Sequence, residues 1–461
     1  MDVTYEDFSL WLEPDGPDSV VRARSPAGED SDRLAFAVDP EPFLAPFSEL
    51  TLARSGTRDL RRASGLEPRP RPEDLGDRLY QALFPPRIRD LYEASRGTDP
   101  RKGLRLKLHL AADTQAPGHD GLAALSNLPW ELAYRRSTRD LLGINRLSPV
   151  VRYLELPRPA QAAPFKPPLR VLAVAANPSG SEPLALEQER RQLQSAWKGS
   201  ADVEVIERAS TERFQDALRQ GPFHVVHFMG HGTVDGTGVG RLFFEDAEGG
   251  PELVSAEVFA NVLKGRMPRL VVLNACRSAE TAGDAGRDFF AGMASALVLG
   301  GLPAVVAMRT PISDRAALTF SKTFYKELAA GEPVDAAAAE ARLAIYRTDP
   351  GSVEWATPVV FMRVSDGRLF AADAAPEEDG GDAGQPDLVR LTVDEDMELA
   401  DAEIGNVIGT EAGPRRAGRV EIEAKKRLVS TGKFQLFNRK NPAGIHANEQ
   451  PHSGAQPRRP H

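Results

Sequence analysis

The sequence predicts an α/β protein: a mostly parallel β-sheet flanked by helices, with an N-terminal α+β region before it and a small β-rich module after it. Three observations lead to this prediction. Short runs rich in β-branched residues alternate with helical periodicity from residue 169 to about 363, as in a doubly wound sheet. Strict apolar–polar alternation occurs near both ends of the chain, as in half-exposed strands. Proline-rich or acidic low-complexity segments separate the three parts.

The N-terminal α+β region is predicted to span residues 1–155, with 72–155 packed on the domain that follows. Alternation at 5–12 and 104–110 predicts strands. Apolar residues at helical spacing in 77–84 predict a helix.

A proline-rich linker at 156–168 leads into the principal domain, predicted at 169–370. Its strands are expected at 169–176, 203–206, 223–232, 269–276, 304–308 and 358–362, with a hairpin near 242–254. Its helices are expected at 184–197, 211–219, from 255, in the first half of 289–308, at 314–328 and at 334–346.

The C-terminal part begins with an acidic linker at 371–387, whose composition is that of a disordered segment. A small β-rich accessory module is predicted at 388–437, where alternation resumes, followed by a disordered polar tail at 438–461. No internal repeat is apparent in the sequence.

Composition restricts the function classes. The 461 residues allow about three domains of ~150 residues each. The formal net charge of −9 gives no basic excess, so direct nucleic-acid binding is not expected. A single cysteine excludes an intramolecular disulfide framework and fits a reducing cytoplasm. The chain begins with acidic, polar residues where a signal peptide would be basic and then apolar, so we expect a cytoplasmic protein.

One segment has the length of a membrane span. Residues 289–308 carry no charge over about 20 positions. The GGLP sequence at 300–303 divides this segment, which predicts a buried helix followed by a buried strand. No membrane span is therefore expected.

Two of the predicted strands end in residues that carry chemistry. The run 223–232 ends in His231 and Gly232, and the run 269–276 ends in Cys276. Ligands bind at the carboxyl ends of the strands of an open α/β sheet, where both side chains would emerge. The sequence therefore predicts a nucleophile pair in which His231 takes the proton of the Cys276 thiol.

Glycine at 232 adds to this prediction. Because glycine has no Cβ, the backbone N–H of Gly232 can approach a developing oxyanion, with the N–H of Cys276 as the second donor. Such a set suits acyl transfer, most simply hydrolysis of a peptide bond through a thioester. The alternative is that Cys276 is a buried apolar residue, as free cysteines often are.

Other chemistries have less support. His224 would face the opposite side of its strand from His227 and His231, and no His-Glu-x-x-His pattern occurs, so no metal site is predicted. The glycines at 230–236 do not match a dinucleotide or phosphate loop. No cofactor is expected.

Several motifs resemble the CHAT domain, a bacterial branch of the caspase-like cysteine peptidases related to separase. The resemblance covers roughly residues 75–365. The motifs are FMGHG at 228–232, LNACRS at 273–278, PISD at 311–314, FYKEL at 324–328, LSNLPWELAY at 125–134, VVRYL at 150–154 and WATPVVF at 355–361.

The resemblance implies a caspase-like fold and a Cys–His dyad that needs no third carboxylate. It implies His231 as the base, Cys276 as the nucleophile, and Gly232 with Cys276 as the oxyanion donors. Relatives are commonly regulated proteases of bacterial signalling or defence, so a protein substrate and an activating or sensor partner are expected. Two positions before the cysteine, an acidic side chain could bind a basic P1 residue of the substrate. This position holds Asn274, whose neutral side chain weakens the case for a substrate with a basic P1 residue. Asp314 is expected to cap a helix or, alternatively, to line the substrate pocket.

Three functions remain open. The first is a cysteine endopeptidase whose glycine-rich loops at 232–240 and 279–287 become ordered on activation. The second is a non-catalytic scaffold that binds partners through its terminal regions. The third is a hydrolase or transferase that uses the same dyad on non-peptide acyl groups.

Overall fold

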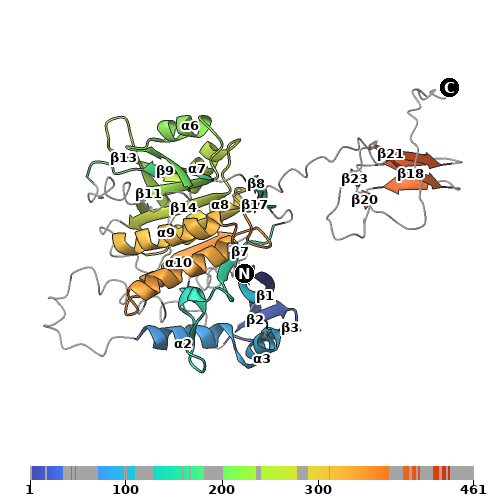
Figure 1. Cartoon of the computed structure of the whole chain (residues 1–461), viewed down its shortest axis with the longest axis horizontal. Coiled ribbons are helices and arrows are strands. Elements are labelled where there is room, and N and C mark those ends of the chain that lie inside the picture. The colour runs from blue at the N-terminus through green and yellow to red at the C-terminus, as the bar shows by residue number, and fades with distance from the viewer. Residues whose placement is uncertain are drawn as a thin grey trace. The chain divides into compact units, whose positions relative to one another are not determined.

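One continuous β-sheet organises the first of two units, Met1–Asp373 and Ala374–His461, into which the chain divides (Figure 1). The computed structural model describes the first unit at residues 3–15, 18–34, 43, 47, 71–97, 99, 101–109, 128–156, 160–165, 168–180, 201–234, 240–277, 289–310 and 312–372. In the second unit it describes the strands given below.

Thirteen of the described strands between residues 4 and 362 form one sheet. Their order across the sheet is β10 (Ala201–Ile206), β9 (Leu169–Ala175), β11 (Val225–Val234), β14 (Leu270–Arg277), β15 (Ala304–Met308), β16 (Pro358–Met362), β7 (Val150–Tyr153), β4 (Lys102–His109), β1 (Thr4–Asp15), β2 (Asp18–Ser25) and β3 (Gly28–Arg33). A hairpin of β12 (Gly240–Glu245) and β13 (Pro251–Ser255) pairs with the end of β11. Neighbours from β10 to β15 are parallel, as are β16, β7, β4 and β1. The predicted mostly parallel sheet is therefore confirmed.

Helices cover both faces of the central part of this sheet, where strands such as β9, β15 and β16 are buried on both sides. On one face, α9 (Asp314–Ala329) and α10 (Val334–Thr348) share a hydrophobic core with Met229 and Val272 (Figure 1). The other face packs Phe228 against a second core. The helices that contribute to this core are α6 (Thr211–Arg219), α7 (Ala256–Leu263) and α8 (Phe289–Leu299). The helix expected at 184–197 lies outside the described residues.

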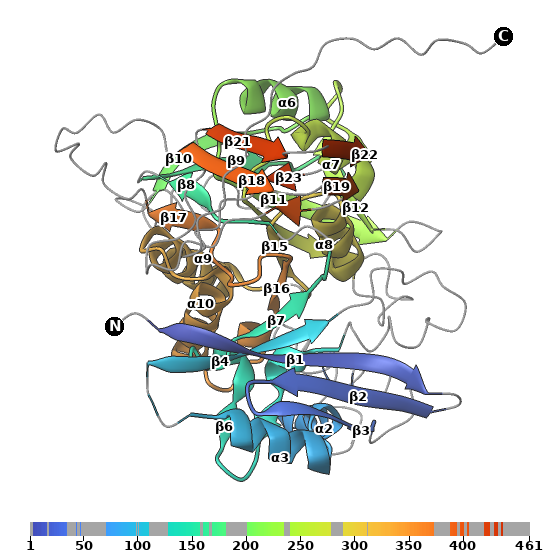
Figure 2. The same cartoon turned by 90° about the vertical axis from the view of Figure 1, so that its right-hand side faces the viewer.

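The N-terminal strands extend the same sheet, because β4 pairs with β7, and β1 with β4 (Figure 2). Helices α2 (Pro72–Leu83) and α3 (Pro86–Ser95) pack against them through an aromatic cluster. Its ring centroids lie 5.2 Å apart for Phe8 and Tyr92 and 4.8 Å apart for Phe84 and Tyr92. Within the proline-rich segment, β8 (Ala163–Phe165) pairs with β17 (Phe370–Ala372).

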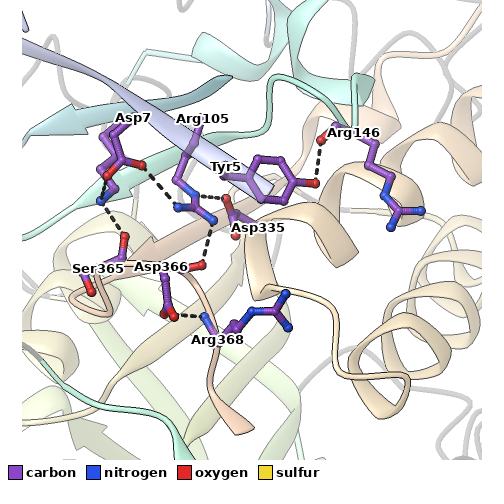
Figure 3. A network of polar contacts seen from close by, with 9 residues as sticks. Tyr5, Asp7, Arg105, Arg146, Asp335, Ser365, Asp366 and Arg368 are labelled. Carbon is purple, nitrogen blue, oxygen red and sulfur yellow. Dashed lines mark hydrogen bonds and ion pairs between the residues drawn. The ribbon is translucent and has the colours of Figure 1, made fainter. Parts of the chain in front are cut away.

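A buried polar network ties β1 and β4 to the start of α10 (Figure 3). Arg105 Nε donates to Asp335 Oδ2 at 2.5 Å, and both side chains are almost fully buried. Asp7 accepts from both Arg105 and Lys107. Gly367 has a φ of +73°, and a Cβ there would lie 2.3 Å from Asp335 Oδ1, so this turn requires glycine.

A second buried cluster joins two of the sequence motifs. Glu131, in the 3₁₀ turn Trp130–Leu132, pairs with Arg152 of β7. Arg342 of α10 lies 3.7 Å from the same carboxylate and donates to the Pro358 carbonyl at 2.9 Å. Burial raises the pKa of Glu131, but the charges of Arg152 and Arg342 outweigh burial and lower it. The cluster therefore holds an ionised carboxylate at full burial, which only paired cations permit.

The uncharged stretch 289–308 forms helix α8 and then strand β15, as predicted. Among the described residues, no helix combines the length and the apolar character needed to cross a membrane.

The described residues of the second unit form three pairs of parallel strands. They are β18 (Leu388–Val393) with β21 (Arg419–Ala424), β19 (Met397–Ala400) with β22 (Leu428–Thr431), and β20 (Glu403–Ile404) with β23 (Gln435–Leu436). These strands lie within residues 388–437, where the sequence predicts a β-rich module.

Candidate active site

Three neighbouring parallel strands place Asn177, His231 and Cys276 in one row across the sheet. His231 of β11 is the register partner of Cys276 of β14. On the other side of β11, Met229 is the register partner of Ala175 of β9, so Asn177 follows two residues later at the level of His231. The predicted strand ends therefore meet at one edge of the sheet.

His231 belongs to the sheet face that α9 and α10 cover. Side chains two residues apart share a face of a strand, so His227, Met229 and His231 lie on one side of β11. His227 lies deeper and contacts Tyr325 of α9, with 2.9 Å between Nδ1 and the hydroxyl oxygen. Burial lowers the pKa of His227 to about 3, so this ring is neutral in the folded protein. His231 is 2% exposed at the end of the same row.

The three histidines of this region have separate roles. His224 accepts a hydrogen bond on Nδ1 from the Arg170 backbone N–H at 2.8 Å. His227 pairs with Tyr325, and His231 with Asn177. Each of these contacts therefore has a different partner.

Asn177 is the site residue that the sequence reasoning missed. Its side-chain oxygen Oδ1 lies 3.4 Å from His231 Nε2. An amide oxygen only accepts hydrogen bonds, so a hydrogen bond in this contact requires the tautomer with its proton on Nε2, which leaves Nδ1 as the basic nitrogen of the neutral ring. The same rule that selected His231 and Cys276, a polar residue just after a buried strand, would have selected Asn177 after β9.

Asn177 is itself held from the β12 hairpin. Its backbone N–H donates to Glu245 Oε1 at 2.9 Å, and Arg208 Nε donates to Glu245 Oε2 at 3.4 Å. The Glu245 residue is 5% exposed. A buried carboxylate with two donors fixes the backbone at Asn177 and thereby the position of its side chain.

Gly232, the last residue of the predicted strand, lies within β11. Its register partners are Arg277 of β14 and Leu242 of β12. The strand continues to Val234, so the first part of the predicted loop 232–240 is extended sheet because the β12 hairpin pairs with it. Residues 235–239 and the predicted loop 279–287 lie outside the described residues.

The two predicted pocket residues differ in position. Asn274 of β14 is the register partner of Met229, is half-buried, and precedes Cys276 by two residues in the sequence. Asp314 is the first residue of α9. The prediction that Asp314 caps this helix is wrong: Ser313 is the N-cap, and its Oγ accepts the Ala316 N–H at 3.3 Å. Serine in this position satisfies a helix N–H that has no partner within the helix.

The arrangement groups a thiol residue, a buried imidazole and an amide side chain that can orient the imidazole.

No curated protein matches the sequence. The model of the CHAT domain matches residues 73–368, more than half of the 461-residue chain. The chain therefore belongs to the CHAT domain family, and the resemblance seen in the motifs is confirmed.

Solved structures of Saccharomyces cerevisiae separase in complex with securin, at 3.0 Å and 2.6 Å resolution, are similar to this chain. Each is 11% identical in sequence, with TM-scores of 0.41 and 0.39. The alignments cover 78% of this chain and 30% of each separase chain. The chain thus corresponds to less than a third of separase.

Proposed function

We propose that the protein is a cysteine endopeptidase in which Cys276 is the nucleophile and His231 the general base. The observation that carries the proposal is the register pairing of His231 with Cys276 on adjacent parallel strands. This register brings two residues with reactive side chains to the carboxyl ends of adjacent strands, where α/β proteins bind ligands. Membership of the CHAT family supports the same assignment.

The chemistry follows from these roles. His231 takes the proton of the thiol, and the thiolate sulfur of Cys276 bonds to the carbonyl carbon of the scissile peptide. Backbone N–H groups of Gly232 and Cys276 are proposed to stabilise the oxyanion. The imidazolium then protonates the leaving amine as the C–N bond breaks. Water, deprotonated by His231, attacks the resulting thioester and releases the carboxylate product and the thiol.

Asn177 is proposed as a positioning residue for His231. By accepting from Nε2, its side chain holds the imidazole in the tautomer whose Nδ1 is basic. Asn177→Ala is expected to lower kcat by about 10- to 100-fold with little change in KM, because a misoriented base costs rate rather than binding. Steady-state kinetics on a peptide that the wild-type chain cleaves measure this effect.

Asn177→Asp is the matched variant, because it keeps an acceptor oxygen at the same reach. It is expected to retain most of the activity and to raise the pKa of His231, which shifts the pH profile of kcat upward. A purely structural role for Asn177 would instead give equal losses in both variants, together with lower thermal stability and an unchanged pH profile.

The test of the whole proposal is the pH dependence of iodoacetamide alkylation of the native protein. The chain has one cysteine, so the signal reports Cys276 alone. We expect an apparent thiol pKa well below the ordinary value of about 8.5 in the wild type, and a return toward that value in His231→Ala. His224→Gln serves as the control, because His224 lies next to the same strand but bonds to Arg170. A thiol that titrates near 8.5 in both wild type and His231→Ala would favour the scaffold function.

The remaining parts of the proposal come from the family resemblance. They are a protein substrate, control by an activating or sensor protein, a role in bacterial signalling or defence, and a cytoplasmic location. The same dyad could act on a non-peptide acyl group, and profiling with peptide and ester libraries separates these two cases.

A further inference from the structure

The hairpin of β12 and β13 contacts two residues that support the proposed reaction. Leu242 of β12 is the register partner of Gly232, whose backbone N–H is a proposed oxyanion donor. At the end of the same strand, Glu245 accepts the backbone N–H of Asn177 on Oε1 at 2.9 Å. One element therefore reaches both the oxyanion strand and the amide that orients His231.

Aromatic packing holds the part of the hairpin that carries Glu245. The preceding residue, Phe244, is fully buried. Its ring centroid lies 5.3 Å from that of Phe228 in β11 and 6.0 Å from that of Phe214 in α6. The backbone N–H of Glu245 donates to the Ala209 carbonyl at 2.8 Å. A side chain on a packed strand is held more precisely than one on a loop, as a residue that positions others requires.

The second carboxylate oxygen of Glu245 binds Arg208. Arg208 Nε donates to Oε2 at 3.4 Å, and the side chains of Arg208 and Glu245 are 73% and 7% exposed. Arg208 has a φ of +50°, a value that residues other than glycine adopt only where the surrounding structure enforces it. A buried ion pair is weak evidence for stability, whereas a charged acceptor forms a hydrogen bond roughly twice as strong as a neutral one. The carboxylate of Glu245 is therefore better suited to fixing Asn177 than to stabilising the fold.

The contact between Asn177 and His231 is sensitive to the position of this segment. Asn177 Oδ1 lies 3.4 Å from His231 Nε2, already longer than the usual 2.9–3.0 Å of such a bond. The segment after β9 is tied to the hairpin a second time, because the Ser179 N–H donates to the Gly249 carbonyl at 2.8 Å. Loss of the Glu245 acceptor would free the backbone of Asn177 and weaken the bond to the imidazole.

We propose that Glu245 is a positioning residue for the reaction: it fixes Asn177 so that His231 keeps its proton on Nε2 and Nδ1 as the basic nitrogen. The inference rests on the proposed function, because His231 must act as the base. Glu245 acts through Asn177 and not on the reacting atoms, so its removal lowers kcat and leaves KM unchanged.

A double-mutant cycle between Glu245→Ala and Asn177→Ala tests this route. Glu245→Ala alone is expected to lower kcat by about 10-fold on a peptide that the wild-type chain cleaves. In the Asn177→Ala background, the same substitution is expected to change kcat by less than about 2-fold, because two residues that act through one contact are not additive.

Glu252→Ala is the matched control. Glu252 is a carboxylate on the other strand of the hairpin, and it accepts a hydrogen bond from Thr211 Oγ1 at 3.3 Å. This variant is expected to keep the kcat of the wild type. An equal loss of kcat in Glu252→Ala, or a loss by Glu245→Ala that recurs in full in the Asn177→Ala background, overturns the proposal, because either result shows a general effect on the fold.

Nitrogen NMR of the chain labelled with ¹⁵N-histidine gives a second measurement, which does not need a substrate. The signals of His231 are assigned by their loss in His231→Ala. The wild type is expected to show the tautomer protonated on Nε2, and Glu245→Ala a mixture of both tautomers. An unchanged tautomer in Glu245→Ala overturns the inference even in an active peptidase. A wild-type chain in which Cys276 titrates as an ordinary thiol instead overturns the proposed function, and this role of Glu245 with it.

Discussion

Cys276→Ala is expected to lower kcat/KM by about 10⁴-fold or more on any peptide that the wild-type chain cleaves. The substitution removes the sulfur that forms the covalent bond to the carbonyl carbon. Substrate binding and the backbone oxyanion donors remain, so the residual rate stays above that of the uncatalysed reaction. Product formation followed by mass spectrometry measures the loss.

His231→Ala is the companion variant, and its loss is expected to be of the same order. Nucleophile and base act as a unit, so the double variant should be no slower than either single variant. The control is again His224→Gln, which leaves both groups in place. Losses in the two single variants that multiply in the double variant would show that His231 and Cys276 act in separate steps, contrary to the proposed dyad.

Glu131→Gln is expected to lower the free energy of unfolding of the first unit by about 3–5 kcal/mol. The amide is nearly the same shape as the carboxylate but carries no charge. It would leave the guanidinium groups of Arg152 and Arg342 buried without a counter-ion, at 1% and 0% exposure. All four tryptophans of the chain lie before residue 373, so their fluorescence in denaturant reports the unfolding of this unit.

The pH dependence of this effect follows from the lowered pKa of Glu131 in the folded state. A carboxyl group with a lowered folded pKa stabilises the fold above its unfolded pKa, about 4.3, and loses this contribution as the pH falls through the folded value. The difference in free energy of unfolding between wild type and Glu131→Gln should therefore be largest at neutral pH and become smaller as the pH falls.

Asp74→Asn is the control: it breaks an exposed ion pair with Arg136, which contributes at most about 1 kcal/mol. A Glu131 variant no less stable than Asp74→Asn would contradict the buried-pair argument.

Local patterns were enough to predict much of the structure. The apolar runs at 223–232 and 269–276 became β11 and β14, and the uncharged stretch at 289–308 became α8 and β15. Strand burial depends on the residues of the strand itself, so periodicity and composition reveal it. The proximity of His231 to Cys276 also followed, because parallel strands bring their carboxyl ends to one edge.

Other features depended on contacts between residues far apart in the chain. Asn177 meets His231 across 54 positions, and Arg105 meets Asp335 across 230. Nothing in the neighbouring sequence marks these residues as partners. The arrangement of the strands and helices decides which residue each of them meets. The helix cap at Ser313 rather than Asp314 was settled by one local hydrogen bond that either residue type could have made.

By itself the sequence determined which segments are buried strands and helices, and which two strand ends carry a thiol and an imidazole. These properties arise from the chemistry of consecutive residues. The tertiary structure decided the continuous sheet that joins β7 to β16, the buried ion clusters, the amide beside His231 and the parallel strand pairs of the second unit. All four depend on which strands and helices become neighbours, and the packing of the whole chain decides this. A buried charge or an unpaired strand edge costs free energy unless a partner, often distant in the sequence, bonds to it.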